Sequence, residues 1–197
     1  MGEMIKMVVV LTVLSIVSGG SLSGLKVFTE PKIENQVMNL VKGPAIRQIL
    51  EAADNDPVED RFKITDGEEE RNIFVGVFDG TADTVVVESS ANGYGGKIGM
   101  VVAINMVEEK LRGVAVTTHT ETPGLGANAK SDPTFAAQFT GKSITDSFGV
   151  TTDGGQISAL SGATITSRAV ATGVNQAVET YKELKPQLEE QINSMGK

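Results

Sequence analysis

The chain has 197 residues and a formal net charge of −8, so we expect one folded domain with an appendage. The acidic balance argues against a nucleic-acid partner, which favours a basic surface. The absence of cysteine excludes disulfides, thiolate metal ligands, a cysteine nucleophile and a lipid anchor on cysteine. His119 is the only histidine, so a histidine-rich metal site is also excluded, and we expect no metal.

The N-terminal region contains a long uncharged segment. No Asp, Glu, Lys or Arg occurs between Met7 and Leu25, and a membrane-spanning helix needs about 20 such residues. A signal peptide is the alternative, because Met7–Val17 is apolar and small residues follow it. Glu3 lies where a signal peptide is normally positive, which favours an uncleaved anchor. We expect residues 1–27 to form one transmembrane anchor, and lysines on both sides leave its orientation undecided.

The next region connects the anchor to the main domain. Apolar residues at helical spacing predict a helix over Thr29–Ala53, which Gly43-Pro44 should divide into two pieces. The segment Asp54–Arg71 is acidic and predicts a solvated loop, with a possible short strand at Arg61–Thr65. We therefore assign residues 28–60 to a helical connecting segment.

Strand patterns dominate the region that follows. Runs rich in Val and Phe predict strands, and they lie at Asn72–Phe78, Thr84–Glu88, Lys97–Met106 and Leu111–Thr118. An Asp79-Gly80 turn separates the first pair, and a charged turn at Glu108–Lys110 separates the second. We expect an antiparallel sheet with helices packed on it, which is the α+β class, in a domain spanning residues 61–197.

Four further elements are predicted after these strands. Asp132–Thr140 predicts a short helix with two phenylalanines on one side. Phe148–Thr151 and Gln156–Leu160 predict two short strands, joined by a tight hairpin turn at Asp153-Gly154-Gly155. The chain ends in a long helical pattern, which Pro186 should interrupt or kink.

The C-terminal helix is predicted to be amphipathic. Its apolar residues recur at gaps of three and four positions, and they are Val170, Val174, Val178, Tyr181, Leu184, Leu188 and Ile192. Ser161-Gly162-Ala163-Thr164 stands directly before it. Hydroxyl residues favour a helix start, where unpaired N–H groups and a partial positive charge can hold a phosphate. Gly162 and Ala163 leave room for a bulky group, whereas a plain helix cap is the alternative interpretation.

Two glycine-containing loops are candidates for lining a site. The turn Gly93-Tyr94-Gly95-Gly96 has one aromatic side chain, and by itself it predicts only a flexible connection. In Thr118–Gly126, a proline and two glycines set an unusual backbone path directly after a strand. Such loops let the main chain approach a ligand closely.

Taken together, these motifs resemble the FMN-binding-domain family. The family's signatures are similar to Gly-Tyr-Gly-Gly at 93–96, Glu-Thr-Pro-Gly-Leu-Gly at 121–126, the segment 135–143 and Ser-Gly-Ala-Thr at 161–164, and they occur here in family order. The resemblance implies that Thr164 carries FMN through a phosphoester bond. It also implies that a separate flavin transferase uses FAD as the donor, and no His or Cys lies near Thr164 in sequence to activate its hydroxyl.

If FMN is attached at Thr164, residues near it in the helix start and the two loops are the other candidate cofactor-binding residues. Ser161, Gly162 and Ala163 would adjoin the phosphate, while Arg168 either faces it or lies in solvent. The residues expected to cover or shape the flavin site are Tyr94, Gly95, His119, Glu121, Thr122, Pro123, Gly124, Leu125 and Gly126. We assign no catalytic acid or base, because a cofactor carries the redox chemistry itself.

The family includes the G subunit of Rnf electron-transport complexes and the C subunit of sodium-pumping NADH:quinone oxidoreductases. The Gly-Tyr-Gly-Gly form favours the Rnf protein. That resemblance implies an electron relay in a complex that couples electron flow between ferredoxin and NAD to ion transport. Its partners would be integral-membrane and redox subunits, with the flavin domain on the extracytoplasmic side of the inner membrane. The chain alone should not reduce NAD, since it lacks a Gly-x-Gly-x-x-Gly fingerprint after a strand.

One position departs from the family pattern. The family usually has Asp three residues before the serine of Ser-Gly-Ala-Thr, where it helps to define the site for the transferase, and this chain has Ser158. The departure leaves a second interpretation, an anchored extracytoplasmic scaffold or binding domain without flavin. A third is the C subunit of the quinone oxidoreductase, which shares the cofactor.

Overall fold

The computed structural model describes residues 2–67 and 69–195, which fall into two compact units that divide between Leu40 and Val41. The first unit contains α1 (Gly2–Val37) and the start of a π-helical turn, η1 (Met38–Lys42). Within the described ranges, one helical stretch is long and apolar enough to cross a membrane, with a mean hydropathy of 2.0 over 18 residues. The predicted single apolar helix at the N-terminus is therefore present.

The break predicted at Gly43-Pro44 takes the form of the π turn η1, after which α2 (Gly43–Ile49) begins. Proline lies in the first turn of α2, where its missing N–H costs no intrahelical hydrogen bond. The helix ends at Ile49, four residues before the predicted end at Ala53.

The second unit is built on a five-stranded antiparallel sheet whose spatial order is the chain order. Its strands are β1 (Phe62–Asp66), β2 (Glu69–Phe78), β3 (Thr81–Asn92), β4 (Lys97–Asn105) and β5 (Lys110–Thr118). All five strands predicted between residues 61 and 118 are present. The turn between β2 and β3 has positive φ at both Asp79 and Gly80, as a tight two-residue hairpin requires.

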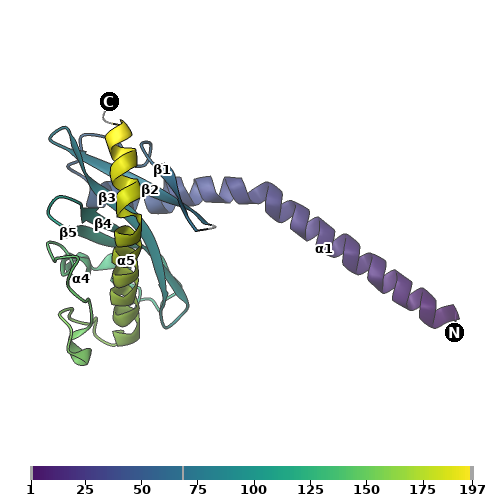
Figure 1. Cartoon of the computed structure of the whole chain (residues 1–197). Coiled ribbons are helices and arrows are strands. Elements are labelled where there is room, and N and C mark those ends of the chain that lie inside the picture. The colour runs from purple at the N-terminus through teal and green to yellow at the C-terminus, as the bar shows by residue number, and fades with distance from the viewer. Residues whose placement is uncertain (1, 68, 196–197) are drawn as a thin grey trace. The chain divides into compact units, whose positions relative to one another are not determined.

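One face of the sheet packs against α5 (Thr164–Met195), which lies across it in Figure 1. Alternate strand residues such as Val85, Val87 and Met100 form a single core with the apolar stripe of the helix. The stripe is buried from Val170 to Leu188, as its spacing predicted. Because residues alternate between faces along a strand, the intervening Val86 and Val101 are buried against the other side, where α2 contacts β4 and β5.

The C-terminal helix continues through Pro186, so the interruption predicted as one outcome there does not occur. Proline removes one backbone donor from a helix. Leu184 and Leu188, on either side of it, are both buried in the core, so the turns before and after Pro186 are both packed against the sheet.

The predicted strand pair over residues 148–160 is wrong. This segment contains a 3₁₀ turn, η2 (Thr151–Asp153), and one isolated parallel bridge between Val150 and Ile157. Gly155 lies so close to Gly149 that a Cβ on it would be 2.1 Å from the Gly149 carbonyl oxygen. Apolar residues of both runs are buried as irregular chain, so burial rather than strand pairing accounts for their composition.

A pair of short helices lies beside the edge strand β5. The helix predicted over Asp132–Thr140 is α4 (Pro133–Ala137), with the Asp132 side chain as its N-cap, and α3 (Asn128–Ser131) precedes it. Both phenylalanines of this segment are buried, as predicted. At the start of the edge strand β5, the Leu111 N–H and carbonyl form hydrogen bonds with the backbone of the chain that follows α4.

Candidate functional site

Thr164 is the first residue of α5 and is half-buried. The turn before it is fixed by Ser167, whose buried hydroxyl accepts from the Leu160 N–H at 2.9 Å and donates to the Ala163 carbonyl at 3.0 Å. Gly162 has a φ of +70°, which residues with a Cβ rarely adopt. The helix start therefore presents the Thr164 side chain and the first-turn N–H groups from a well-defined turn.

A cavity of about 570 Å³ opens beside Thr164. Three segments that are distant in sequence meet there: the 93–96 turn, the 121–126 loop and the first turn of α5. The lining residues are Tyr94, Glu121, Thr122, Leu125, Gly126, Gly162, Ala163, Thr164, Ile165 and Thr166. The structure thus brings together three of the four predicted motifs, and the segment 135–143 does not line the cavity.

The rim of this cavity is apolar and exposed. Tyr94 is 73% exposed, Leu125 44% and Ile165 48%. Among described residues of the second unit, the only other large hydrophobic side chain exposed to this extent is Val107. Exposed apolar groups that gather at one place mark a binding site more often than scattered ones do.

Glu121 connects the three segments beneath the rim. Its side chain is buried, with 6% of the residue exposed. One carboxylate oxygen accepts the Gly95 N–H at 2.7 Å, and the other accepts the hydroxyl of Thr166. The loop and the turn are further joined by the Thr120 hydroxyl, which donates to the Gly95 carbonyl at 2.9 Å.

The hydroxyl of Thr164 makes no hydrogen bond within the residues that the structure describes. The neighbouring hydroxyls of Thr166 and Ser167, by contrast, are buried and bonded. A threonine hydroxyl is a poor nucleophile unless a base takes its proton. This geometry leaves Thr164 open to a reagent from outside but supplies no base of its own.

Six of the predicted site residues lie outside the cavity lining, and these are Gly95, His119, Pro123, Gly124, Ser161 and Arg168. Arg168 forms a bidentate ion pair with Asp153, with N–O distances of 2.6 and 2.9 Å. The hydrogen bond lowers the pKa of Asp153 and raises the pKa of Arg168. Nδ1 of His119 accepts the backbone N–H of Glu121 at 3.2 Å, so this histidine shapes the loop.

Comparison with known proteins gives relatives that cover most of the chain. The G subunit of the Na(+)-translocating ferredoxin:NAD(+) oxidoreductase complex of Acetobacterium woodii is 31% identical over 91% of this chain and 92% of that protein. The G subunit of the ion-translocating oxidoreductase complex of Cereibacter sphaeroides is 34% identical over 73% of this chain and 69% of that protein. The chain belongs to the G-subunit family of ion-translocating oxidoreductase complexes. Residues 93–179 also match the FMN-binding domain family, a range that contains the turn, the loop and the helix start.

A solved structure supports the fold of this G-subunit family member. The C subunit of the Na(+)-translocating NADH-quinone reductase of Parabacteroides distasonis superposes with a TM-score of 0.56 at 23% identity, covering 71% of this chain and 89% of that chain. At this identity the likeness concerns the fold alone. It confirms the α+β architecture predicted from the strand and helix patterns.

Two residues that line the cavity in this G-subunit protein were not predicted as site residues. They are Ile165 and Thr166. Thr166 lies four positions before Val170, on the buried side of the same helical stripe. A hydroxyl at a buried stripe position must find a hydrogen-bond partner. The helical spacing therefore contained a usable signal for Thr166, although its partner Glu121 is 45 residues away.

Ser158, at the position where the sequence resemblance implies an Asp, is exposed. Its backbone is held by Gln138, whose amide accepts the Ser158 N–H at 2.7 Å and donates to the Ser158 carbonyl at 3.1 Å. The backbone at this position is therefore fixed without help from the serine hydroxyl. A larger polar side chain would extend into solvent.

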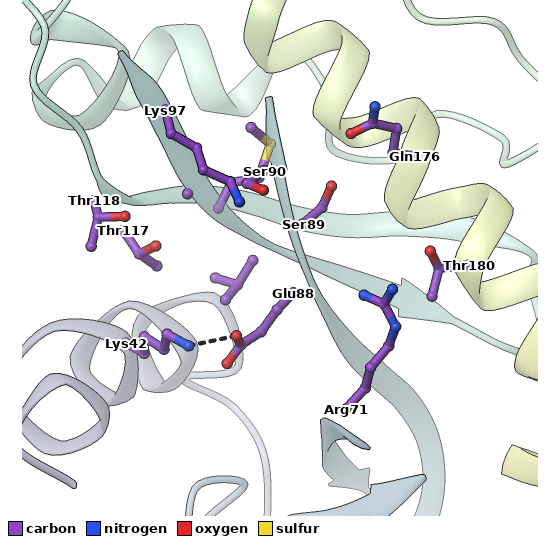
Figure 2. Close-up of a pocket in the computed structure, with 13 residues that line it drawn as sticks. Lys42, Arg71, Glu88, Ser89, Ser90, Lys97, Thr117, Thr118, Gln176 and Thr180 are labelled. Carbon is purple, nitrogen blue, oxygen red and sulfur yellow. Dashed lines mark hydrogen bonds and ion pairs between the residues drawn. The ribbon is translucent and has the colours of Figure 1, made fainter. Parts of the chain in front are cut away.

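A second cavity, of about 540 Å³, lies away from Thr164 and is shown in Figure 2. The register between β2 and β3 ends at Ile73↔Val87, while β3 continues beside β4 as far as Asn92. The sheet therefore opens at this point, and α5 and Lys42 lie on opposite sides of the opening (Figure 2). Its lining is mostly polar and includes a Lys42–Glu88 ion pair. Thr118, the first residue of the Thr118–Gly126 loop, is the one residue of the two candidate loops in this lining.

Proposed function

We propose that this chain is a flavoprotein subunit of an Rnf-type ion-translocating oxidoreductase complex, with FMN bound covalently to Thr164 through a phosphoester bond. The observation that supports this proposal most directly is the position of Thr164. It is a half-buried hydroxyl without a hydrogen bond among the described residues, at the start of α5 and beside a cavity lined by the 93–96 turn, the 121–126 loop and the Ser-Gly-Ala-Thr motif.

The residues present fit such a group. A phosphodiester on Thr164 would lie at a helix N-terminus, where backbone N–H groups and the helix dipole stabilise an anion. Tyr94, Leu125 and Ile165 offer apolar surface for the ring system. Arg168 already has Asp153 as its partner, so the helix terminus rather than this side chain would hold the phosphate.

Attachment would require a separate flavin transferase. Thr164 has no hydrogen-bonded base among the described residues, and self-attachment would need one. The exposed cavity rim leaves the hydroxyl accessible to an incoming enzyme that carries FAD.

Once bound, FMN would supply the redox chemistry, while the protein orients it. The chain would relay electrons between neighbouring redox and integral-membrane subunits, anchored by its one apolar helix with the flavin domain on the extracytoplasmic side. Its relatives described above are named as G subunits of ion-translocating complexes. The likeness to the quinone-reductase protein is limited to the fold, so the G-type assignment is the one we propose.

The test is in-gel flavin fluorescence of the denatured full chain after co-expression with a flavin transferase. Wild type should fluoresce, and Thr164→Val should be dark. Thr172→Val serves as the matched control, because Thr172 is an exposed threonine on the same helix, and it should fluoresce like wild type. A dark wild-type band, with a transferase active on a known substrate, would favour the flavin-free scaffold instead.

A further inference from the structure

The Glu121 carboxylate is the one side chain that hydrogen-bonds to both the 93–96 turn and the first turn of α5 among the described residues. Its two oxygens take the Gly95 N–H and the Thr166 hydroxyl, which are 26 and 45 residues away in sequence. Both oxygens are therefore engaged by the protein itself. This arrangement is that of a tie between segments rather than of a ligand waiting for a ring.

The chemistry of the three groups is complementary. An ionised carboxylate can only accept hydrogen bonds, and the two groups that face it are an N–H and an O–H donor. Glu121 makes no ion pair within the described part of the chain. A buried carboxylate without a cation depends on such donors for its solvation, so the turn and the helix start are drawn toward it.

Two glycines allow the segments to close around this carboxylate. A Cβ at Gly93 would lie 2.6 Å from one carboxylate oxygen, and a Cβ at Gly126 would lie 2.6 Å from the other. Any side chain at either position would therefore push the carboxylate away from its donors. Gly93 and Gly126 thus share one physical cause, the close packing of backbone against Glu121, and a Cβ at Gly93 would also lie 2.5 Å from Ile98 Cδ1.

We infer that Glu121 is a positioning residue that fastens the 93–96 turn and the 121–126 loop to the first turn of α5, and so preforms the cavity beside Thr164 before any flavin arrives. Tyr94 is held at the rim through the same contact, because it adjoins Gly95. The consequence for flavin attachment rests on the function proposed above. The fastening of the turn and the loop to α5 does not rest on that function, since it is a property of the chain without flavin.

The experiment measures two quantities on the purified full chain made without a transferase. The first is the exchange rate of the Gly95 amide hydrogen, by NMR. The second is the initial rate of covalent flavin incorporation after addition of a purified flavin transferase and FAD. The variants are Glu121→Ala, Glu121→Gln and Thr166→Val. Glu183→Ala is the matched control, since Glu183 is an exposed glutamate on α5.

Glu121→Ala should speed exchange of the Gly95 amide by at least about tenfold, the equivalent of one lost hydrogen bond of ordinary strength, and should slow flavin incorporation by a similar factor. Glu121→Gln should restore both rates to within about threefold of wild type, because its amide can accept from Gly95 and donate to Thr166. Thr166→Val should slow incorporation while the Gly95 amide stays protected. The control should match wild type in both.

An unchanged exchange rate of the Gly95 amide in Glu121→Ala would overturn the inference. So would an unchanged rate of flavin incorporation in Glu121→Ala, provided that the wild-type chain is a substrate of the transferase. If Glu121→Ala does not fold, the Glu121→Gln and Thr166→Val variants decide. Either rate in Glu121→Gln differing from wild type by more than about threefold would then overturn the inference. If wild type takes up no flavin while a known substrate does, the proposed function fails, and the exchange rates alone then support or overturn the tie through Glu121.

Discussion

Position 158 holds Ser where the resemblance described above implies an Asp in the family. Ser158 is exposed, and its backbone is already held by Gln138. Restoring the acidic residue should therefore leave the fold intact and change only what an incoming transferase meets. We expect Ser158→Asp to raise the initial rate of flavin incorporation severalfold, measured with purified transferase and FAD.

The matched control for this change is Ser194→Asp, which adds the same charge at an exposed site near the far end of α5. It should leave the rate unchanged. Equal rates for wild type and Ser158→Asp would show that the transferase does not read this position, and the flavin-free interpretation would lose its motivation.

A substitution at Gly126 shows whether the loop has room for one additional methyl group. A Cβ there would lie 2.6 Å from both a Glu121 oxygen and the Thr166 hydroxyl oxygen. We expect Gly126→Ala to reduce the free energy of unfolding by about 1–3 kcal/mol, as overpacking of a filled interior does, measured by urea titration of the flavin-free chain. Gly149→Ala is the control, because a Cβ there meets only the Gly155 Cα at 3.6 Å, and it should cost less.

At the scale of elements, one ion pair fastens α5 to the hairpin between β4 and β5. Lys185 donates to Glu109 at 2.7 Å. This hydrogen bond lowers the pKa of Glu109 and raises the pKa of Lys185. Because the pKa of Glu109 is lower folded than unfolded, the pair stabilises the fold above the unfolded value of about 4.3, and the stabilisation is lost as the pH falls through the folded pKa.

We therefore expect Lys185→Met to lower the urea midpoint at pH 7, and the difference from wild type to shrink as the pH falls below about 4. In a Glu109→Gln background, Lys185→Met should have little effect at either pH. A difference that stays constant down to acid pH would assign the effect to packing of the lysine stem rather than to the ion pair.

Elements built from local patterns were predictable from the sequence. The strands from β1 to β5 follow from β-branched runs between turn residues, and the stripe from Val170 to Leu188 gave the buried side of α5. The segment 148–160 was not predictable in this way. Its apolar runs are buried around a close approach of Gly149 and Gly155, and composition does not distinguish a buried strand from a buried irregular chain.

The candidate site shows the same limit. The motifs that line the cavity were visible in the sequence, because glycine, proline and hydroxyl residues mark loops and helix starts locally. The role of Glu121 was not, since its partners lie 26 and 45 residues away. Arg168 could not be placed either, because its partner Asp153 lies in the segment that was wrongly predicted as a hairpin.

At the scale of the whole molecule, the proposed extracytoplasmic side of the second unit can be tested with a single thiol. The chain has no cysteine, so Val107→Cys, at a position 77% exposed between β4 and β5, would carry its only thiol. We expect a membrane-impermeant maleimide to label Val107→Cys in intact cells. Glu3→Cys, before the apolar segment, should react only after lysis, and the reverse pattern would place the domain in the cytoplasm.

The order of the sheet has a consequence for how the molecule is made. Each strand pairs with its neighbour in the chain, and such local contacts form early and quickly. The acceptor threonine, in contrast, stands at the start of the last helix, and the cavity beside it exists only when that helix has docked on the completed sheet. A modifying enzyme that needs this cavity would thus act after folding has finished, and the attached group would report which chains had reached their final structure.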